Sequence, residues 1–327
     1  MLTLLTGAIS WRLREPFTIA RGTASTADGV LVVLFDEDGH IGKGEAYGVN
    51  YRRETPDTML AQIAAAAADI RAGISRRELL HLLPAGGARC AVDAALWDIE
   101  AKRSGIPAWR GAGVPPPLPK TSAVTIGIGT PARMRARAAE LSQHALLKIK
   151  VDANDPLSLL QAVREGAPRP AIILDPNASW SIDLLHRLLP PLRDLGVVLI
   201  EQPLAPKDDA ALADIPHAIP ICADESIHVP DDLDRIAGRY DVVNIKLDKT
   251  GGLTAALDLA DAAQARGFQL MVGCMWGSSL AMAPAAILAQ RCQFVDLDGP
   301  LLQIGDHQPA IRYEDGLMAF PQRELWG

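Results

Sequence analysis

Polar and apolar residues alternate along residues 1–55, which is the pattern of strands that bury one face. The apolar, β-branched run Val30–Phe35 leads into a turn signal at Asp36 to Gly39, and the segment Ile41–Ala46 begins a return strand. This part of the chain therefore predicts antiparallel hairpins.

Helical spacing replaces this alternation from Thr55 onward. Pro56 stands at the first position of a predicted helix, where proline is common. Two further segments carry apolar residues near helical spacing, the alanine-rich Met59–Ile70 and Arg89–Lys102. Four prolines between Gly111 and Pro119 predict a linker, so we expect one α+β domain over residues 1–115.

Beyond residue 120, short β-rich segments recur at intervals of roughly 25 residues. Helical patterns fill most of the gaps, for example over Ala132–Ser142, Leu157–Glu165 and Leu253–Arg266. Eight strand–helix units predict a (β/α) barrel over residues 120–302, and the remaining residues, 303–327, are expected to return to the N-terminal domain. The predicted strands are Ala123–Ile128, Leu146–Val151, Ala171–Pro176, Val197–Gln202, Pro220–Asp224, Val242–Leu247, Gln269–Gly273 and Phe294–Asp298.

Composition and charge exclude several classes of protein. The chain has 327 residues with 49% hydrophobic and 22% charged residues, an ordinary globular balance. Its net charge of −7 argues against a nucleic-acid surface. The apolar run Ile63–Ala68 is too short to span a membrane. Four scattered cysteines and no recognisable signal peptide predict a cytoplasmic protein, and the sequence is compatible with a homo-oligomer.

Acidic residues stand at the carboxyl ends of three successive predicted strands. Asp175, Glu201 and Asp224 are hard oxygen donors, and no histidine or cysteine accompanies them. Barrel enzymes place their sites at this end of the strands. Any one of these acids alone could cap a helix or pair with a lysine, but three in register predict one Mg²⁺ site.

Lysines flank the predicted metal site on both sides. Lys148 and Lys150 are two residues apart on one strand, so they face the same way at about 6.7 Å. Their repulsion is expected to lower the pKa of one of them, with nearby acids acting in the opposite direction. Lys246 lies on another strand, well around the barrel. Two such lysines could reach opposite faces of one carbon, although a solvated strand or a simple ion pair would also explain them.

The ordered series of motifs resembles the enolase superfamily, and its muconate-lactonizing subgroup in particular. The motif that follows the last strand, Asp296-x-Asp298-Gly299-Pro300, resembles the dipeptide epimerases within that subgroup. The resemblance extends to Pro16-Phe17 and Gly44-Glu45-Ala46 near the N-terminus. The series consists of Lys148-x-Lys150, Asp175-x-Asn177, Glu201-Gln202-Pro203, Asp224-Glu225-Ser226 and Lys246-x-Asp248.

The resemblance implies an α/β fold, a modified (β/α)₇β barrel of TIM type under an α+β capping domain. It also implies an isomerase that inverts the α-carbon of the C-terminal residue of a dipeptide, L-Ala-D/L-Glu, by proton transfer through an enolate. Such an enzyme would serve the recycling or catabolism of peptidoglycan peptides. One Mg²⁺ per subunit and a small dipeptide substrate follow from the same resemblance, with no nucleic acid or membrane as partner.

The resemblance implies a role for each matching residue. Lys150 and Lys246 would be the acid and base pair, and Lys148 would stabilise the enolate and tune Lys150. Asp296 and Asp298 would hold the free ammonium of the dipeptide. The implied metal ligands are Asp175, Glu201 and Asp224, and the implied supporting residues are Asn177, Glu225 and Asp248.

The residues that bind the substrate side chain are less well determined by the sequence. The loops Thr18–Asp28 and Tyr47–Glu54 are expected to cover the site. Arg21, in the first loop, or Arg52 or Arg53, in the second, could bind a side-chain carboxylate, although each could also be an ordinary surface arginine. Met275-Trp276-Gly277 could shape the pocket or serve only as packing.

Several other activities fit parts of the pattern. Cycloisomerisation, o-succinylbenzoate synthesis and N-acylamino acid racemisation use the same scaffold, but their substrates carry no free ammonium for Asp296 and Asp298. A class I aldolase would form a Schiff base on Lys150 or Lys246 and would leave the three acids without a purpose. A metal-binding barrel without catalysis is the remaining alternative.

Overall fold

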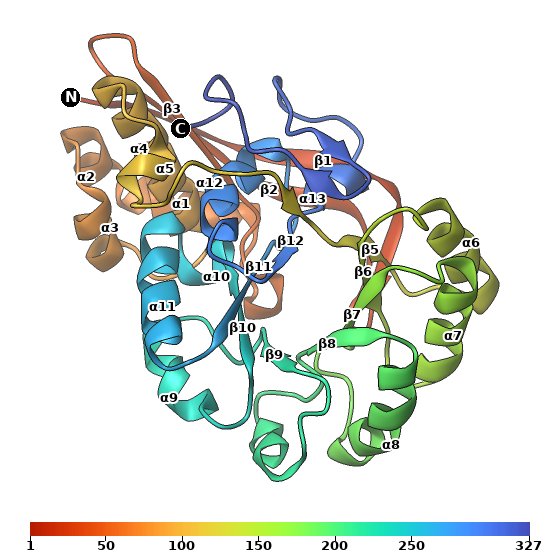
Figure 1. The fold of residues 1–327 in the computed structure, drawn as a ribbon. Coiled ribbons are helices and arrows are strands. Elements are labelled where there is room, and N and C mark those ends of the chain that lie inside the picture. The colour runs from red at the N-terminus through yellow and green to blue at the C-terminus, as the bar shows by residue number, and fades with distance from the viewer.

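The computed structural model describes residues 1–327 and contains a small antiparallel sheet beside a barrel of parallel strands (Figure 1). The small sheet has the order β1 (Thr3–Ile19), β2 (Gly22–Phe35) and β3 (Ile41–Ala46). The predicted hairpin is confirmed, since Phe35 pairs with Ile41 across the turn. β1 is longer than the others and reaches toward the barrel, which brings its C-terminal end over the strand ends (Figure 1).

Helices follow the small sheet. Thr55 caps the first one, as the Thr55-Pro56 pair predicts, and accepts a hydrogen bond from the Thr58 amide. The alanine-rich segment Met59–Ile70 is helical as its pattern predicts, but it is divided between two helices, because the chain leaves helical geometry at Ala66 (φ −92°, ψ 2°). The elements are η1 (Asn50–Arg52), α1 (Pro56–Ala65), α2 (Ala67–Ala72), α3 (Arg76–Leu82), α4 (Gly87–Ser104) and α5 (Ala108–Gly111).

Helix α4 is the central helix of the small domain and confirms the helix predicted over Arg89–Lys102. It packs directly on β3, where two glycines allow the backbones to approach. A Cβ on Gly44 would lie 2.0 Å from the Ala91 carbonyl oxygen, and one on Gly42 would lie 2.2 Å from that of Ala95. Only glycine fits at such distances, so this contact fixes the helix against the sheet.

Eight parallel strands form the barrel, and all eight predicted strands are confirmed with ends shifted by a few residues. The backbone amide of Ala123 donates to the Val295 carbonyl (2.8 Å), which joins the first strand region to the last. The strands are β5 (Val124–Ile126), β6 (Leu146–Lys150), β7 (Ala171–Asp175), β8 (Val197–Glu201), β9 (Ile221–Ala223), β10 (Val242–Lys246), β11 (Gln269–Gly273) and β12 (Phe294–Asp296).

Helices cover the outside of the barrel (Figure 1). The three predicted helices are confirmed as α6 (Pro131–Glu140), α7 (Pro156–Gly166) and α11 (Leu253–Ala265). Only short helices follow β8 and β9, so the outer layer is incomplete there. The remaining elements are α8 (Ile182–Asp194), η2 (Asp209–Asp214), η3 (Pro230–Asp232), α9 (Leu233–Ile236), α10 (Leu247–Thr250), α12 (Ser279–Ala289) and α13 (Gly299–Leu302).

The residues after the barrel fold back toward the N-terminal part of the chain. β13 (Tyr313–Glu314) and β14 (Leu317–Met318) form a small sheet with β4 (Lys120–Thr121). At the end of the chain, the Trp326 indole donates to the Ala94 carbonyl in α4 (3.0 Å). No helix in the structure combines the length and the apolar character needed to cross a membrane.

Two layers of apolar residues hold the barrel. One cluster of 79 buried residues includes side chains of both the small domain and the barrel, so the two parts share a continuous core. A separate cluster fills the inside of the barrel with one residue from each of several strands, among them Ile173, Leu199 and Met271. The interior is therefore a packed core, and the polar site lies at its carboxyl end.

Candidate functional site

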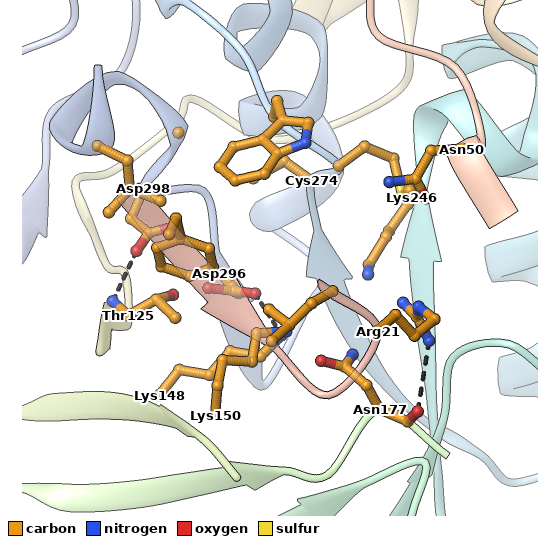
Figure 2. Close-up of a pocket in the computed structure, with 16 residues that line it drawn as sticks. Arg21, Asn50, Thr125, Lys148, Lys150, Asn177, Lys246, Cys274, Asp296 and Asp298 are labelled. Carbon is orange, nitrogen blue, oxygen red and sulfur yellow. Dashed lines mark hydrogen bonds and ion pairs between the residues drawn. The ribbon is translucent and has the colours of Figure 1, made fainter. Parts of the chain in front are cut away.

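A cavity opens at the carboxyl ends of the barrel strands (Figure 2). Phe17, Ile19 and Arg21, from the β1–β2 hairpin, line one side of it, and Lys148, Lys150 and Lys246 line the barrel side. The cavity therefore lies between the small domain and the barrel, where both loops predicted to cover the site can contribute residues.

The three predicted metal ligands lie at adjacent strand ends. Asp175 ends β7, Glu201 ends β8 and Asp224 directly follows β9, and these strands are neighbours in the barrel. All three side chains are buried, at 0%, 0% and 1% exposure. The chain turns sharply after two of these strands, where Asn177 and Gln202 adopt positive φ values of 47° and 39°.

Each of these carboxylates is paired with lysine. Asp175 lies 2.5 Å from the Lys150 ammonium, Lys148 lies 2.8 Å from Glu201, and Lys246 lies 2.7 Å from Asp224. The three acids are therefore turned toward ammonium groups, and their oxygens do not all lie within 4.8 Å of one another. This differs from the arrangement predicted from sequence, in which the three acids converge on one point.

The electrostatics of the three acids nevertheless fit a divalent cation. Burial and the nearby charges of Asp175 and Asp224 together raise the pKa of Glu201 to about 7, although Lys148 and Lys246 act in the opposite direction. The lysines therefore offset only part of the cost of holding this carboxylate beside two others. One of its oxygens also lacks a hydrogen bond of good geometry. A buried set of three carboxylates with no histidine or cysteine is the donor chemistry that Mg²⁺ prefers.

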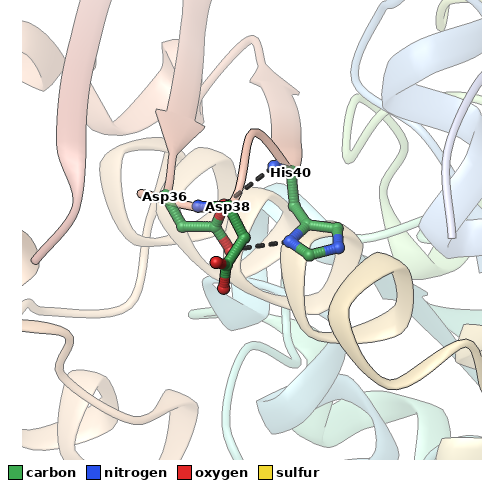
Figure 3. A group of neighbouring side chains, drawn as sticks. All are labelled: Asp36, Asp38 and His40. Carbon is green, nitrogen blue, oxygen red and sulfur yellow. Dashed lines mark hydrogen bonds and ion pairs between the residues drawn. The ribbon is translucent and has the colours of Figure 1, made fainter.

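Another group of side chains comes close enough to share a metal ion, but it lies far from the barrel site in the β2–β3 turn. Asp36, Asp38 and His40 form it (Figure 3). The Asp36 carboxylate accepts hydrogen bonds from the His40 amide (2.8 Å) and from Arg103 (2.7 Å). These contacts account for the cluster as the hydrogen bonding of a turn.

The lysines lie on opposite sides of the cavity (Figure 2). Lys148 and Lys150 are on β6 and Lys246 is on β10, with three strands between them in a barrel of eight. Burial lowers the pKa of Lys148 and of Lys246, but the facing acids outweigh burial and raise both. The sequence predicts opposing effects of the neighbouring lysine and the nearby acids on the pKa of one lysine. For Lys148 the acids prevail, because three carboxylates surround it.

The two acids of the last motif also line the cavity. Asp296 accepts a hydrogen bond from Lys148 (2.7 Å) through one oxygen, and its other oxygen is buried without a partner. Asp298 accepts from the Thr125 amide (2.6 Å). Burial and the charge of Asp296 raise the pKa of Asp298 to about 7. An arriving ammonium group would satisfy both the unpaired oxygen and the excess negative charge.

The three candidate arginines are placed differently. Arg21 lines the cavity, pairs with Glu225, and stacks over the Tyr51 ring at 5.2 Å. Arg52 is exposed and lines a neighbouring hollow that shares Arg21 but not the lysines. Arg53 is exposed and ends η1 at φ 64°. Of the three, Arg21 is therefore the one that the structure brings to the cavity.

The three predicted supporting residues contact different partners. The backbone amide of Asn177 donates to Asp175 (2.9 Å), and Glu225 pairs with Arg21. Asp248 does not form the hydrogen bond or ion pair with Lys246 or with the three acids that a supporting residue would form. Its carboxylate accepts from the backbone amides of Tyr47 and Gly48 (both 2.7 Å). Burial raises its pKa to about 6.

Sequence reasoning missed two residues that hold the acids. The Lys249 ammonium is buried and lies 2.6 Å from the Asp224 carboxylate. The Asn244 side chain donates to Glu201 (3.0 Å). Both have a signal in the sequence, because Asn244 lies two residues before Lys246 on the same strand face and Lys249 lies one helical turn after it.

Comparisons with known proteins agree with this geometry. Residues 132–324 match the family described as enolase C-terminal domain-like, and residues 1–111 match the mandelate racemase / muconate lactonizing enzyme N-terminal domain. The L-Ala-D/L-Glu epimerase of Escherichia coli (strain K12) is 43% identical to this chain, over 94% of this chain and 96% of the relative. The chain belongs to the dipeptide epimerase family of the enolase superfamily.

Two further proteins are similar to this family member over nearly their whole length. An N-acetyl-D-glutamate racemase from Pseudoalteromonas sp. is also 43% identical, over 91% of this chain and 95% of the relative. The crystal structure of an enolase family member from Agrobacterium tumefaciens, with homology to dipeptide epimerases, has a TM-score of 0.97 and 43% identity. It covers 100% of both chains and contains sodium and L-Ala-L-Glu with an ordered loop.

Replacing Lys148 should show how much its ion pairs with Asp175, Glu201 and Asp296 contribute to the free energy of unfolding. K148M leaves Asp175, Glu201 and Asp296 without their shared cation, so we expect the free energy of unfolding to fall by about 3–5 kcal/mol in EDTA. Urea unfolding followed by circular dichroism measures this change. The matched control K207M removes an exposed lysine (84% exposed) and should change the free energy by less than about 0.5 kcal/mol. A loss below about 1 kcal/mol in K148M would contradict the network.

Proposed function

We propose that this chain is a Mg²⁺-dependent dipeptide epimerase that inverts the α-carbon of the C-terminal residue of L-Ala-D/L-Glu. The chain is an isomerase of the racemase and epimerase class, as its relatives are. The observation that carries the proposal is the placement of Lys150 and Lys246 on opposite sides of one cavity, above three buried carboxylates.

Asp175, Glu201 and Asp224 would hold the metal ion. When bound, the ion would supply positive charge to the substrate carboxylate, and it would replace the lysines as the partner of these three acids. Lys246 owes its raised pKa to Asp224 and Glu201, so its neutral form is favoured once those acids have another partner. Lys148 lines the same cavity, so its ammonium would stabilise negative charge that develops on the substrate carboxylate.

The two remaining lysines would carry the proton. One of Lys150 and Lys246, in its neutral form, removes the α-proton from its side of the substrate. The other, protonated, delivers a proton to the opposite face, which inverts the centre. Because β6 and β10 lie across the barrel from each other, the carbon need not turn over between the two steps.

The two ends of the dipeptide would be held by charge. Asp296 and Asp298 are suited to the free ammonium, because Asp296 has an unpaired buried oxygen and the pair carries excess negative charge. Arg21, rather than Arg52, is suited to the glutamate side-chain carboxylate, because Arg21 lines the same cavity as the lysines. An N-acylated glutamate would offer no ammonium to the two acids.

The structure also bears on how the chain is divided into domains and on where the enzyme works. We propose a capping domain of residues 1–115 completed by residues 303–327, over a barrel of residues 120–302. The hydrogen bonds from Trp326 to Ala94 and from Gly327 to Asp98 support this division. Four free cysteines, three of them buried, support the proposal that the enzyme works in the cytoplasm.

Proton exchange tests the proposed reaction. In D₂O with Mg²⁺ and L-Ala-L-Glu, the protein should exchange the α-proton of the glutamate residue and form L-Ala-D-Glu. Proton NMR measures both changes. K150M and K246M should each abolish epimerisation, because inversion needs a base on one face and an acid on the other. Each single variant should still exchange the α-proton of the one diastereomer that its remaining lysine can reach. EDTA should abolish the reaction, and readdition of Mg²⁺, but not of Na⁺, should restore it. Absence of exchange across a broad set of dipeptides would reject the proposal.

The acids of the last motif separate the epimerase from an N-acetylglutamate racemase. Each charged hydrogen bond to an ammonium contributes about 1.5–3 kcal/mol, so D296N/D298N should lower kcat/KM for L-Ala-L-Glu by roughly 100-fold or more. Turnover of N-acetyl-glutamate, if present in the wild-type protein, should change far less. Equal losses on both substrates, or faster wild-type turnover of N-acetyl-glutamate, would favour the racemase.

The choice of arginine is tested by a matched pair of variants. R21M should raise KM for L-Ala-L-Glu by roughly 10-fold or more while affecting L-Ala-L-Met much less, because only glutamate offers a carboxylate. R52M, the control, should leave the ratio between the two substrates unchanged. The assignment of Arg21 fails if R52M alters this ratio and R21M does not.

A further inference from the structure

The segment of residues 47–54 connects β3 to α1 and forms part of the roof of the cavity. Asn50, in η1, lines the cavity on the side of Lys246 (Figure 2). Tyr51 lines the adjoining hollows and stacks with Arg21. The position of this segment therefore determines the shape of the space available to a substrate.

The segment is tied to the barrel at its beginning by a single carboxylate. Asp248 lies in the first turn of α10, two residues after Lys246, and only 7% of it is exposed. One of its oxygens accepts hydrogen bonds from two consecutive backbone amides, those of Tyr47 and Gly48, each at 2.7 Å. Gly48 has a φ of +68°, the left-handed conformation in which successive amides can point toward one acceptor.

The other contacts of the segment differ in kind. Glu54 accepts from the Val49 amide (2.6 Å) and from Gly87 (3.1 Å), so it closes the segment on its own domain. The Tyr51 hydroxyl lies 3.1 Å from Nε2 of His228, which holds the tip against the loop after β9. Asp248 therefore supplies the barrel contact that fixes where the segment starts.

Asp248 has no lysine or arginine partner among the ion pairs of the structure, although Lys246 is two residues away. Lys246 is held instead by Asp224 (2.7 Å) and by its place in β10. The carboxylate of Asp248 thus binds the segment of residues 47–54 and makes no direct contact with Lys246.

We propose that Asp248 is a positioning residue that holds residues 47–54 over the cavity, so that its loss weakens dipeptide binding more than it slows proton transfer. The part of this inference that concerns dipeptides rests on the proposed function. The part that concerns the segment does not, because the hydrogen bonds exist without a substrate.

The experiment compares D248A with D248N and with a control across the same interface. Asp93, in α4, is buried and accepts from both the amide and the hydroxyl of Thr254, so D93A also removes two hydrogen bonds between the domain and the barrel. It does so away from the cavity lining. Two quantities are measured for each variant: amide hydrogen exchange of peptides covering residues 47–54, and kcat and KM for L-Ala-L-Glu with Mg²⁺.

We expect D248A to speed exchange in residues 47–54 and to raise KM, each by roughly 10-fold, with kcat within about threefold of wild type. D248N keeps an acceptor oxygen in place and should restore both quantities to near wild-type values. D93A should lower stability and leave both quantities unchanged. If D248A does not fold, D248E keeps the charge but displaces it by one methylene, and the same rise in KM is expected.

Three results would overturn the inference. Unchanged exchange and KM in D248A or D248E would show that the segment is held by other contacts. A fall in kcat at constant KM would place Asp248 with Lys246. A rise in KM in D93A equal to that in D248A would show that the rise follows from a general loss of stability and not from the release of residues 47–54. If the wild-type protein shows protected residues 47–54 but no epimerisation, the proposed function fails and the exchange data alone decide the role of Asp248.

Discussion

The structure depends on a set of opposite charges buried at one end of a barrel. Four acids, Asp175, Glu201, Asp224 and Asp296, share Lys148, Lys150, Lys246 and Lys249, and nearly all of these side chains are shielded from water. Such a group is costly to desolvate, and the ion pairs offset that cost. A cation or anion that enters the site must therefore replace ion pairs that these side chains now make with one another.

The barrel makes this concentration of charge possible. Parallel strands with short carboxyl-end loops place one polar residue after another around a ring, while the apolar cluster below them excludes water from the other side. The small domain then completes the enclosure from above. Close packing at Gly42 and Gly44 holds α4 firmly on its sheet, so the parts of the small domain that reach the cavity start from a rigid base.

The sequence predicted the parts of this arrangement that follow from local pattern. The eight strands and their charges could be found because short apolar runs recur along the chain and the few charged residues stand at or near the carboxyl ends of those runs. Arg21 could be proposed but not preferred over Arg52, since both are isolated basic residues in loops. The turn of the three acids toward lysines, and the raised pKa of Lys148, depend on side-chain distances that no spacing reveals.

Asp248 and the break at Ala66 illustrate a different limit. The motif containing Asp248 is visible in the sequence, but its partners are backbone amides two hundred residues earlier, and backbone groups leave no trace in residue identity. At Ala66 an alanine-rich run continues with no proline or glycine to end the helix, so tertiary packing decides the boundary. In both cases the missing information lies in contacts between distant parts of the chain.

The facing arrangement of β6 and β10 has a stereochemical consequence. Two amines of the same chemical type would approach the two hands of one centre, one held beside Asp175 and the other beside Asp224. The final ratio of diastereomers is set by their own relative free energies, and the protein can alter only how fast each is consumed. Any unequal rate must then arise from the different surroundings of the two amines or from how closely the rest of the site fits each hand.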